Sequence, residues 1–169
     1  MAQVLTSVAA RALAICLILL VAACGARIVP LFDEDVVAGL NRANEQTLVL
    51  FSSLSAGARK AEFGAYAAKY DAVIGAFEAV KNRASARVVP PLPAYLAKAK
   101  LTGEICGDDD TTTCLNSSPR FIGRILDILT QMRESHRTGD VDRAEVKIYK
   151  ATYAVSIHQA LTVETALRP

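Results

Sequence analysis

Apolar side chains recur every three or four residues in the middle of this chain, which is the repeat of one face of an α-helix. Charged residues of the same stretch, such as Lys69 and Glu78, mostly fall off that face. The pattern predicts an amphipathic helix that buries one side against other parts of the protein. The apolar stripe comprises Phe63, Tyr66, Ala67, Tyr70, Val73, Ile74, Phe77 and Val80.

A similar helix is predicted before this one, beginning at the acidic run from Asp33 to Asp35, because a helix N-terminus favours carboxylates. Gly57 is predicted to end it, because glycine adopts a positive φ at little cost. Two members of its stripe are polar, Asn44 and Thr47. They either set the register of the packed helices or anchor a ligand in an internal cavity. The stripe comprises Val37, Leu40, Asn44, Thr47, Leu48, Phe51 and Leu54.

Two more helices are predicted in the last third of the chain. Ser118 is the predicted N-cap of the third helix, with Pro119 at the first helical position, where a missing N–H costs nothing. Gly139 is predicted to end that helix and Asp140 to cap the fourth, which runs from Val141 to about Leu167. The third helix has a dense apolar face of Phe121, Ile122, Ile125, Leu126, Ile128, Leu129 and Met132, and the fourth has a wide apolar arc that includes Ala144, Ile148, Ala151, Val155, Leu161 and Leu167.

Four long amphipathic helices, with tight turns joining the first to the second and the third to the fourth, predict an all-α fold. The expected architecture is an antiparallel up-down-up-down four-helix bundle over residues 33–169. A long connection from Val88 to Ser118 joins the second and third helices, with prolines that favour an extended chain and a short helix from Pro93 to Leu101. The start of the first helix, this connection and the C-terminus should therefore share one end of the bundle.

The N-terminal segment has the features of an export signal. Arg11 precedes an uncharged run from Ala12 to Ala23, and no acidic residue occurs before Asp33. The run is shorter than the roughly 20 residues that a membrane-spanning helix needs. A basic start, a short apolar centre and small residues before a break are typical of a secretory signal peptide.

The four residues Val21-Ala22-Ala23-Cys24 resemble the lipobox of bacterial lipoproteins. The resemblance implies that residues 1–23 are a removed signal peptide, that Cys24 is acylated, and that residues 24–32 link the lipid to the bundle. Gly25 is not the aspartate that retains some lipoproteins in the inner membrane, which implies the outer membrane, facing the periplasm. The alternatives are an ordinary cleaved signal with an incidental cysteine and an uncleaved anchor.

Two of the four cysteines are predicted to form a disulfide. Cys16 is lost with the signal and Cys24 is the lipidation site, so Cys106 and Cys114 remain as a pair in an oxidising compartment. A zinc site is not expected there, because no nearby histidine or cysteine completes a tetrahedron.

The sequence favours no catalytic or cofactor chemistry. A net charge of +2 with interspersed signs is too balanced for nucleic-acid binding. His136 and His158 are predicted to differ in depth by more than about 20 Å, so they cannot share a metal or haem iron, and Met132 does not match the depth of His158 either. His158 is expected to be packed. The run Asp108–Asp110 lacks the alternation of a calcium loop. No nucleophile stands in a recognisable triad.

These expectations describe a lipid-anchored envelope protein without cofactors that acts as a structural, scaffolding or regulatory module through contacts with an envelope protein. The alternative is a periplasmic carrier of a small hydrophobic ligand in the bundle core. Four basic residues gather around the long connection and either meet anionic lipid or pair internally. These residues are Arg83, Arg87, Lys98 and Lys100.

Overall fold

The structure is a computed structural model that describes residues 28–93, 106 and 110–169. The expected signal peptide 1–23, the lipidation site Cys24 and nearly all of the expected short helix at 93–101 lie outside the described residues. The described helices are α2 (Glu34–Ser53), η1 (Lys60–Glu62), α3 (Phe63–Ser85), α6 (Thr111–Leu115), α7 (Ser118–Thr138) and α8 (Arg143–Ala166).

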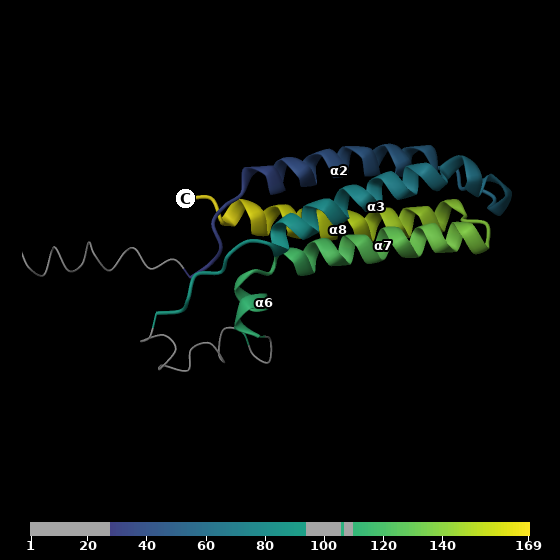
Figure 1. Ribbon diagram of the computed structural model, residues 1–169. Helices are drawn as coiled ribbons and strands as arrows, with labels where there is room; N and C mark the ends of the chain where they lie inside the picture. The colour runs from purple at the N-terminus through teal and green to yellow at the C-terminus, as the bar shows by residue number, and fades with distance from the viewer. Residues whose placement is uncertain (1–27, 94–105, 107–109) are drawn as a thin grey trace, which may run out of the picture.

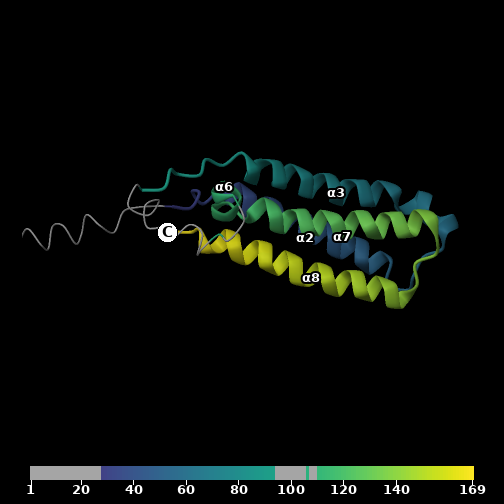
Figure 2. The ribbon, with the colours of Figure 1, turned by 90° about the horizontal axis from the view of Figure 1, so that it is seen from below.

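The four long helices α2, α3, α7 and α8 form an antiparallel bundle with up-down-up-down order, as the sequence predicts (Figure 1). Helix α7 packs most extensively, against α3 and α8, whereas α2 and α8 share the smallest of the four neighbouring contacts. The turns α2–α3 and α7–α8 lie at one end, which we call the turn end. The C-terminus, the start of α2, the end of α3 and the start of α7 lie at the other end, which we call the terminal end (Figure 2).

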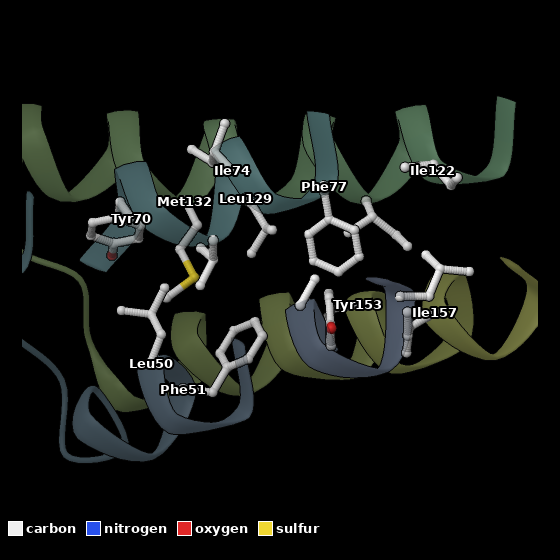
Figure 3. Close-up of a cluster of buried hydrophobic side chains, with 14 of the residues drawn as sticks. Leu50, Phe51, Tyr70, Ile74, Phe77, Ile122, Leu129, Met132, Tyr153 and Ile157 are labelled. Atoms are coloured by element: carbon white, nitrogen blue, oxygen red, sulfur yellow. The ribbon is translucent and has the colours of Figure 1, made fainter. Parts of the chain in front are cut away.

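The core is filled by large side chains from all four helices (Figure 3). Tyr153 of α8 lies at its centre, with its ring centroid 5.4 Å from that of Phe51 and 6.2 Å from that of Phe77. Leu129 and Met132 of α7 are fully buried beside them. Burial of each such side chain stabilises the folded chain by roughly 1.5–3 kcal/mol. This core is therefore the main source of the bundle's stability.

The predicted start and stop of the first helix are confirmed. Asp33 is the N-cap of α2, and its side chain accepts a hydrogen bond from the Asp35 backbone N–H over 3.0 Å. Gly57 follows the helix with a φ of +89°, a conformation that strains other residues. Its neighbour Ala58 exchanges two backbone hydrogen bonds of 2.9 Å with Val141, so the two turns of the bundle pair with each other.

This pairing moves the start of the fourth helix. Asp140 was the predicted cap, but Asp142 is the N-cap of α8 and accepts from the Glu145 backbone N–H at 2.8 Å. Residue Val141 must stay extended to pair with Ala58, so helix α8 cannot begin before it. Asp140 instead accepts a hydrogen bond from the Lys60 backbone N–H at 2.8 Å and joins the two turns.

The predicted cap of the third helix is also wrong by one residue. Helix α7 begins at Ser118 itself, Ser117 is the N-cap, and Pro119 is the second helical residue. The side chain of Ser117 makes no capping hydrogen bond. Ser118 is buried, so it packs at the end of the bundle.

The burial pattern corrects two of the predicted apolar faces. In α2, Leu48 is 44% exposed, and the buried face runs through Val36, Ala43 and Leu50. In α8, the predicted residues Ala144, Ile148, Ala151 and Val155 are exposed. The buried face of α8 consists instead of Val146, Tyr153, Ser156, Ile157, Ala160 and Glu164. A wide apolar arc offers two faces, and only one of them can face the bundle.

Candidate functional site

His136 lies in an aromatic cluster at the turn end of the bundle. It is fully buried, and its ring centroid lies within 5.4–5.9 Å of the ring centroids of Phe63, Tyr66 and Tyr70. Its Nε2 is 3.1 Å from the backbone oxygen of Arg59, which can only accept a hydrogen bond. Nε2 therefore carries a proton, and in the neutral ring Nδ1 accepts from the Tyr70 hydroxyl at 3.3 Å. Burial raises the pKa of Tyr70 well above its ordinary value.

The two ring nitrogens of His136 are thus both used to hold helices together. In the part of the chain that the structure describes, no group of three or more His, Cys, Asp or Glu side chains is placed to hold a metal ion. His158, which the sequence suggested to be packed, is exposed on α8. The cluster around His136 joins α3, α7 and the turn at Arg59.

A buried ion pair occupies the opposite, terminal end. Arg87, just after α3, donates to both carboxylate oxygens of Glu164 in α8 over 2.9 and 2.6 Å. The side chains are 8% and 0% exposed, so the pair is removed from water. Arg83 pairs instead with Asp33, the N-cap of α2, and with Asp35 in its first turn, at 2.7 and 2.6 Å. These two basic residues therefore pair internally, while Lys98 and Lys100 lie outside the described residues.

The long connection is attached to the same end. The side-chain amide of Asn116 donates to the Ala84 backbone oxygen at 2.9 Å. Cys106 and Cys114 form a disulfide, as the sequence predicts, with Cα atoms 5.5 Å apart. Asp110 caps the short helix α6, which contains Cys114. The contact of Asn116 with Ala84 and the Arg87–Glu164 pair therefore lie at the same end of the bundle, where α3 ends.

The polar residues of the α2 stripe are satisfied within the bundle. Asn44 accepts a hydrogen bond from the Tyr153 hydroxyl at 2.9 Å, which links α2 to α8. Thr47 is fully buried, and its hydroxyl donates to the Ala43 backbone oxygen at 2.8 Å. The Asn44–Tyr153 bond has the form of a register-setting contact between two helices.

Three surface hollows are open to solvent rather than enclosed. An apolar groove of about 260 Å³ lies between α2 and α3 and includes Val49 and Val73. A hollow of about 320 Å³ at the turn end includes Gly57 and Val141, and one of about 360 Å³ at the terminal end includes Leu31 and Val88. Ligand pockets generally enclose about 300 Å³ or more of largely apolar space. The groove at Val49 is somewhat smaller than this, but its lining is the most apolar of the three hollows, which makes it the closest in character to a ligand site.

The most unusual surface lies on α8. Six exposed residues follow each other at alternating spacings of four and three, on the side of the helix away from Tyr153. Ile148 is 66% exposed and Val155 59%. Solvent-facing sides of helices ordinarily carry charged residues, but the 13 residues from Ala151 to Val163 include no Asp, Glu, Lys or Arg. We call this surface the outer stripe; it comprises Ala144, Ile148, Ala151, Val155, His158 and Thr162.

The outer stripe has the repeat that two packed helices use at their seam, because residues spaced by three and four form one continuous ridge. The sequence predicts a buried position for five of these residues, Ala144, Ile148, Ala151, Val155 and His158, because periodicity alone does not say which apolar face is buried. Exposed apolar patches of this kind mark surfaces that contact proteins or membranes.

Comparisons with known proteins identify no relative. No protein-family model, no curated protein and no solved structure matches the chain. Within residues 28–93 and 110–169, no helix is both long enough and apolar enough to cross a bilayer.

Proposed function

We propose that the protein is a lipid-anchored component of a bacterial envelope, attached through Cys24, whose bundle is a non-catalytic module for protein contacts. The observation that carries this proposal is the outer stripe of α8, an exposed and uncharged surface on an otherwise charged molecule. The core supports it, because Tyr153, Phe51 and Phe77 fill the centre and the polar groups of Asn44 and His136 are paired.

The proposed anchor agrees with the topology. The start of α2 lies at the terminal end, and its N-cap Asp33 is nine residues after Cys24. An acyl chain contributes about 0.8 kcal/mol per buried CH₂, so several chains on one cysteine hold a protein stably at a bilayer. The gap between lipid and bundle would leave α8 accessible along its whole length. We propose the outer membrane, facing the periplasm, because Gly25 follows the cysteine.

A carrier of a small hydrophobic ligand is the second candidate, and the apolar groove beside Val49 is the observation that favours it. Val49 is 65% exposed, which nearly matches the exposure of Val155 on the outer stripe. The two residues therefore make a matched pair for an experiment: one reports on the proposed protein contact and the other on the groove.

The test places a photoreactive amino acid at Val155 or at Val49 of the full chain, in cells that make the protein naturally. A protein adduct at Val155, identified by mass spectrometry and absent at Val49, is the expected result. A small-molecule adduct at Val49 with no protein adduct at Val155 would favour the carrier and contradict the proposed module.

Lipidation is tested separately by growth with labelled palmitate. The wild-type chain should incorporate the label, and Cys24→Ala should abolish incorporation. Continued labelling of the Cys24→Ala variant would remove the proposed anchor while leaving the role of α8 to be decided by the photo-crosslinking.

A further inference from the structure

We infer that the outer stripe of α8 binds the same stripe of a second copy of this chain, with the two α8 helices antiparallel. This inference rests on the proposed function, because it names the partner of the proposed contact surface. The first four residues of the stripe alternate small and larger side chains, in the order Ala144, Ile148, Ala151 and Val155, and His158 and Thr162 complete it. Small residues let two helix backbones approach closely, and the larger ones fill the space between them.

A two-fold interface places one patch against an identical patch, so a surface that pairs with itself must not bring like charges together. Val155 lies at the middle of the stripe, with no charged residue from Ala151 to Val163. A two-fold axis beside Val155 would put Ile148 of one copy level with Thr162 of the second copy. The Val155 residues of the two copies would then lie level with each other. No like charges would meet in this central part of the interface.

Charges beyond the centre select the antiparallel direction. Asn44 of α2 bonds to Tyr153 of α8, and the two helices are antiparallel, so Glu34 is level with Val163. The proposed axis puts Lys147 level with residue 163 of the second copy, and therefore level with that copy's Glu34. A parallel pair would instead bring Lys147 of the two copies to the same level. Electrostatic complementarity of this kind fixes orientation and register.

A surface next to α8 extends the interface. Leu48 lies one helical turn beyond Asn44, so it lies on the side of α2 that faces α8, and it is 44% exposed. The outer stripe itself is only about 27 Å long at 1.5 Å per residue, and stable interfaces generally bury about 800 Å² per partner. The stripe of one helix covers less than that. Pairing is therefore expected chiefly where the proposed anchor concentrates the chains on one membrane.

A competing occupant is a charged membrane surface. Helices that lie on anionic lipid carry Lys and Arg along their polar face. On α8 the exposed lysines are confined to one end, at Lys147 and Lys150, and the following 13 residues are uncharged. This distribution of charge favours a second copy of the chain over a membrane surface as the partner of the outer stripe.

The test uses single cysteine variants of the full chain, Ile148→Cys and Thr162→Cys, carrying different tags and produced together in the native cells. We expect the mixed 148–162 disulfide to exceed the 148–148 disulfide at least tenfold. Two copies of Val155→Cys should crosslink with each other, and two copies of Val49→Cys, similarly exposed on another face, should not.

A charge exchange provides a second measurement that does not depend on cysteine. Val155→Lys places two positive charges at the proposed axis and should lower the paired fraction at least tenfold, because like charges across an interface are strongly unfavourable. Co-production of Val155→Lys with Val155→Glu should restore pairing between the two variants. Both substitutions are at an exposed site, so circular dichroism should report an unchanged bundle.

Three results would overturn the inference. Dominant 148–148 disulfides would show a parallel pair. Crosslinks from position 155 to residues 94–105 of the same chain, to lipid, or to a different protein would assign another occupant. Capture of a different protein would leave the proposed function standing, whereas the absence of any protein crosslink at position 155 would remove both.

Discussion

Arg87 and Glu164 form a bidentate ion pair at the terminal end of the bundle, with N–O distances of 2.9 and 2.6 Å. The two residues are 77 positions apart in the chain, and the side chain of Glu164 is fully buried. The pair joins the end of α3 to the end of α8, where the N-terminal segment also leaves the bundle. A buried charge is tolerated only while its partner is present.

Glu164→Gln is therefore expected to lower the free energy of unfolding by about 3 kcal/mol, because Arg87 loses its counter-ion in a site removed from water. Urea titration followed by circular dichroism measures the change. The double variant Arg87→Met with Glu164→Leu should recover most of the loss. Glu134→Gln, which breaks the exposed pair with Arg137, serves as the control and should change stability little. Equal effects of Glu164→Gln and Glu134→Gln would contradict the buried character of the first pair.

Tyr70→Phe should destabilise the bundle more than Tyr153→Phe. Loss of the Tyr70 hydroxyl leaves Nδ1 of the fully buried His136 without its donor, and an unsatisfied buried polar group costs about 1–3 kcal/mol. The partner of Tyr153, Asn44, is half-buried and can turn to water. Thermal unfolding of both variants measures the difference, and the reverse order would be inconsistent with the assigned hydrogen bonds.

Two glycines should respond to alanine in opposite directions. At Gly57 the φ is +89°, and an added Cβ would lie 2.9 Å from the Val141 backbone oxygen, so Gly57→Ala should cost at least about 1–2 kcal/mol. Gly75 lies inside α3 with open space around it, so Gly75→Ala should stabilise by about 0.5–1 kcal/mol. Chemical unfolding of the two variants checks both signs. A neutral Gly57→Ala would show that the two turns do not pair as described.

Acid should weaken the bundle partly through Asp33. The side-chain hydrogen bond from Arg83 is the main cause that holds the pKa of Asp33 below its ordinary value, and the backbone hydrogen bond from Asp35 adds to it. A carboxyl whose pKa is lower in the folded chain contributes stability above about pH 4, and this contribution is lost as the pH falls through the folded pKa.

Asp33→Asn keeps a capping side chain but cannot titrate. Its free energy of unfolding should therefore fall less steeply between about pH 5 and pH 2 than that of the wild type, as measured by urea titrations across that range. Arg83→Gln should reduce the slope as well, because it removes the interaction that lowers the pKa of Asp33. A slope unchanged in both variants would exclude this pair as a source of acid sensitivity.

The fold was largely predictable, because it follows from periodicity and from local signals. Three signals determine the structure only within a few residues of where they occur. They are the apolar repeat in residues 63–80, the acidic run from Asp33 to Asp35, and Gly57. The disulfide between Cys106 and Cys114 followed from the lipoprotein resemblance and from counting the remaining cysteines. Each of these signals is readable without knowledge of distant contacts.

The corrections have a common physical cause, which is that long-range contacts decide between local options. Asp140 and Asp142 are both good caps, and the pairing of Val141 with Ala58 selects Asp142. The apolar arc of α8 has one face with Tyr153 and another with Val155, and the larger aromatic side chain takes the core position. The Arg87–Glu164 pair leaves no spacing signal, because its partners come together only in the folded bundle.

Native mass spectrometry of the protein extracted from its own membranes tests the central proposal most directly. The expected species is a chain that begins at an acylated Cys24, with no further small molecule bound. A chain that retains residues 1–23 without acyl groups, or one that carries a hydrophobic small molecule in every copy, would contradict the proposed lipid-anchored contact module.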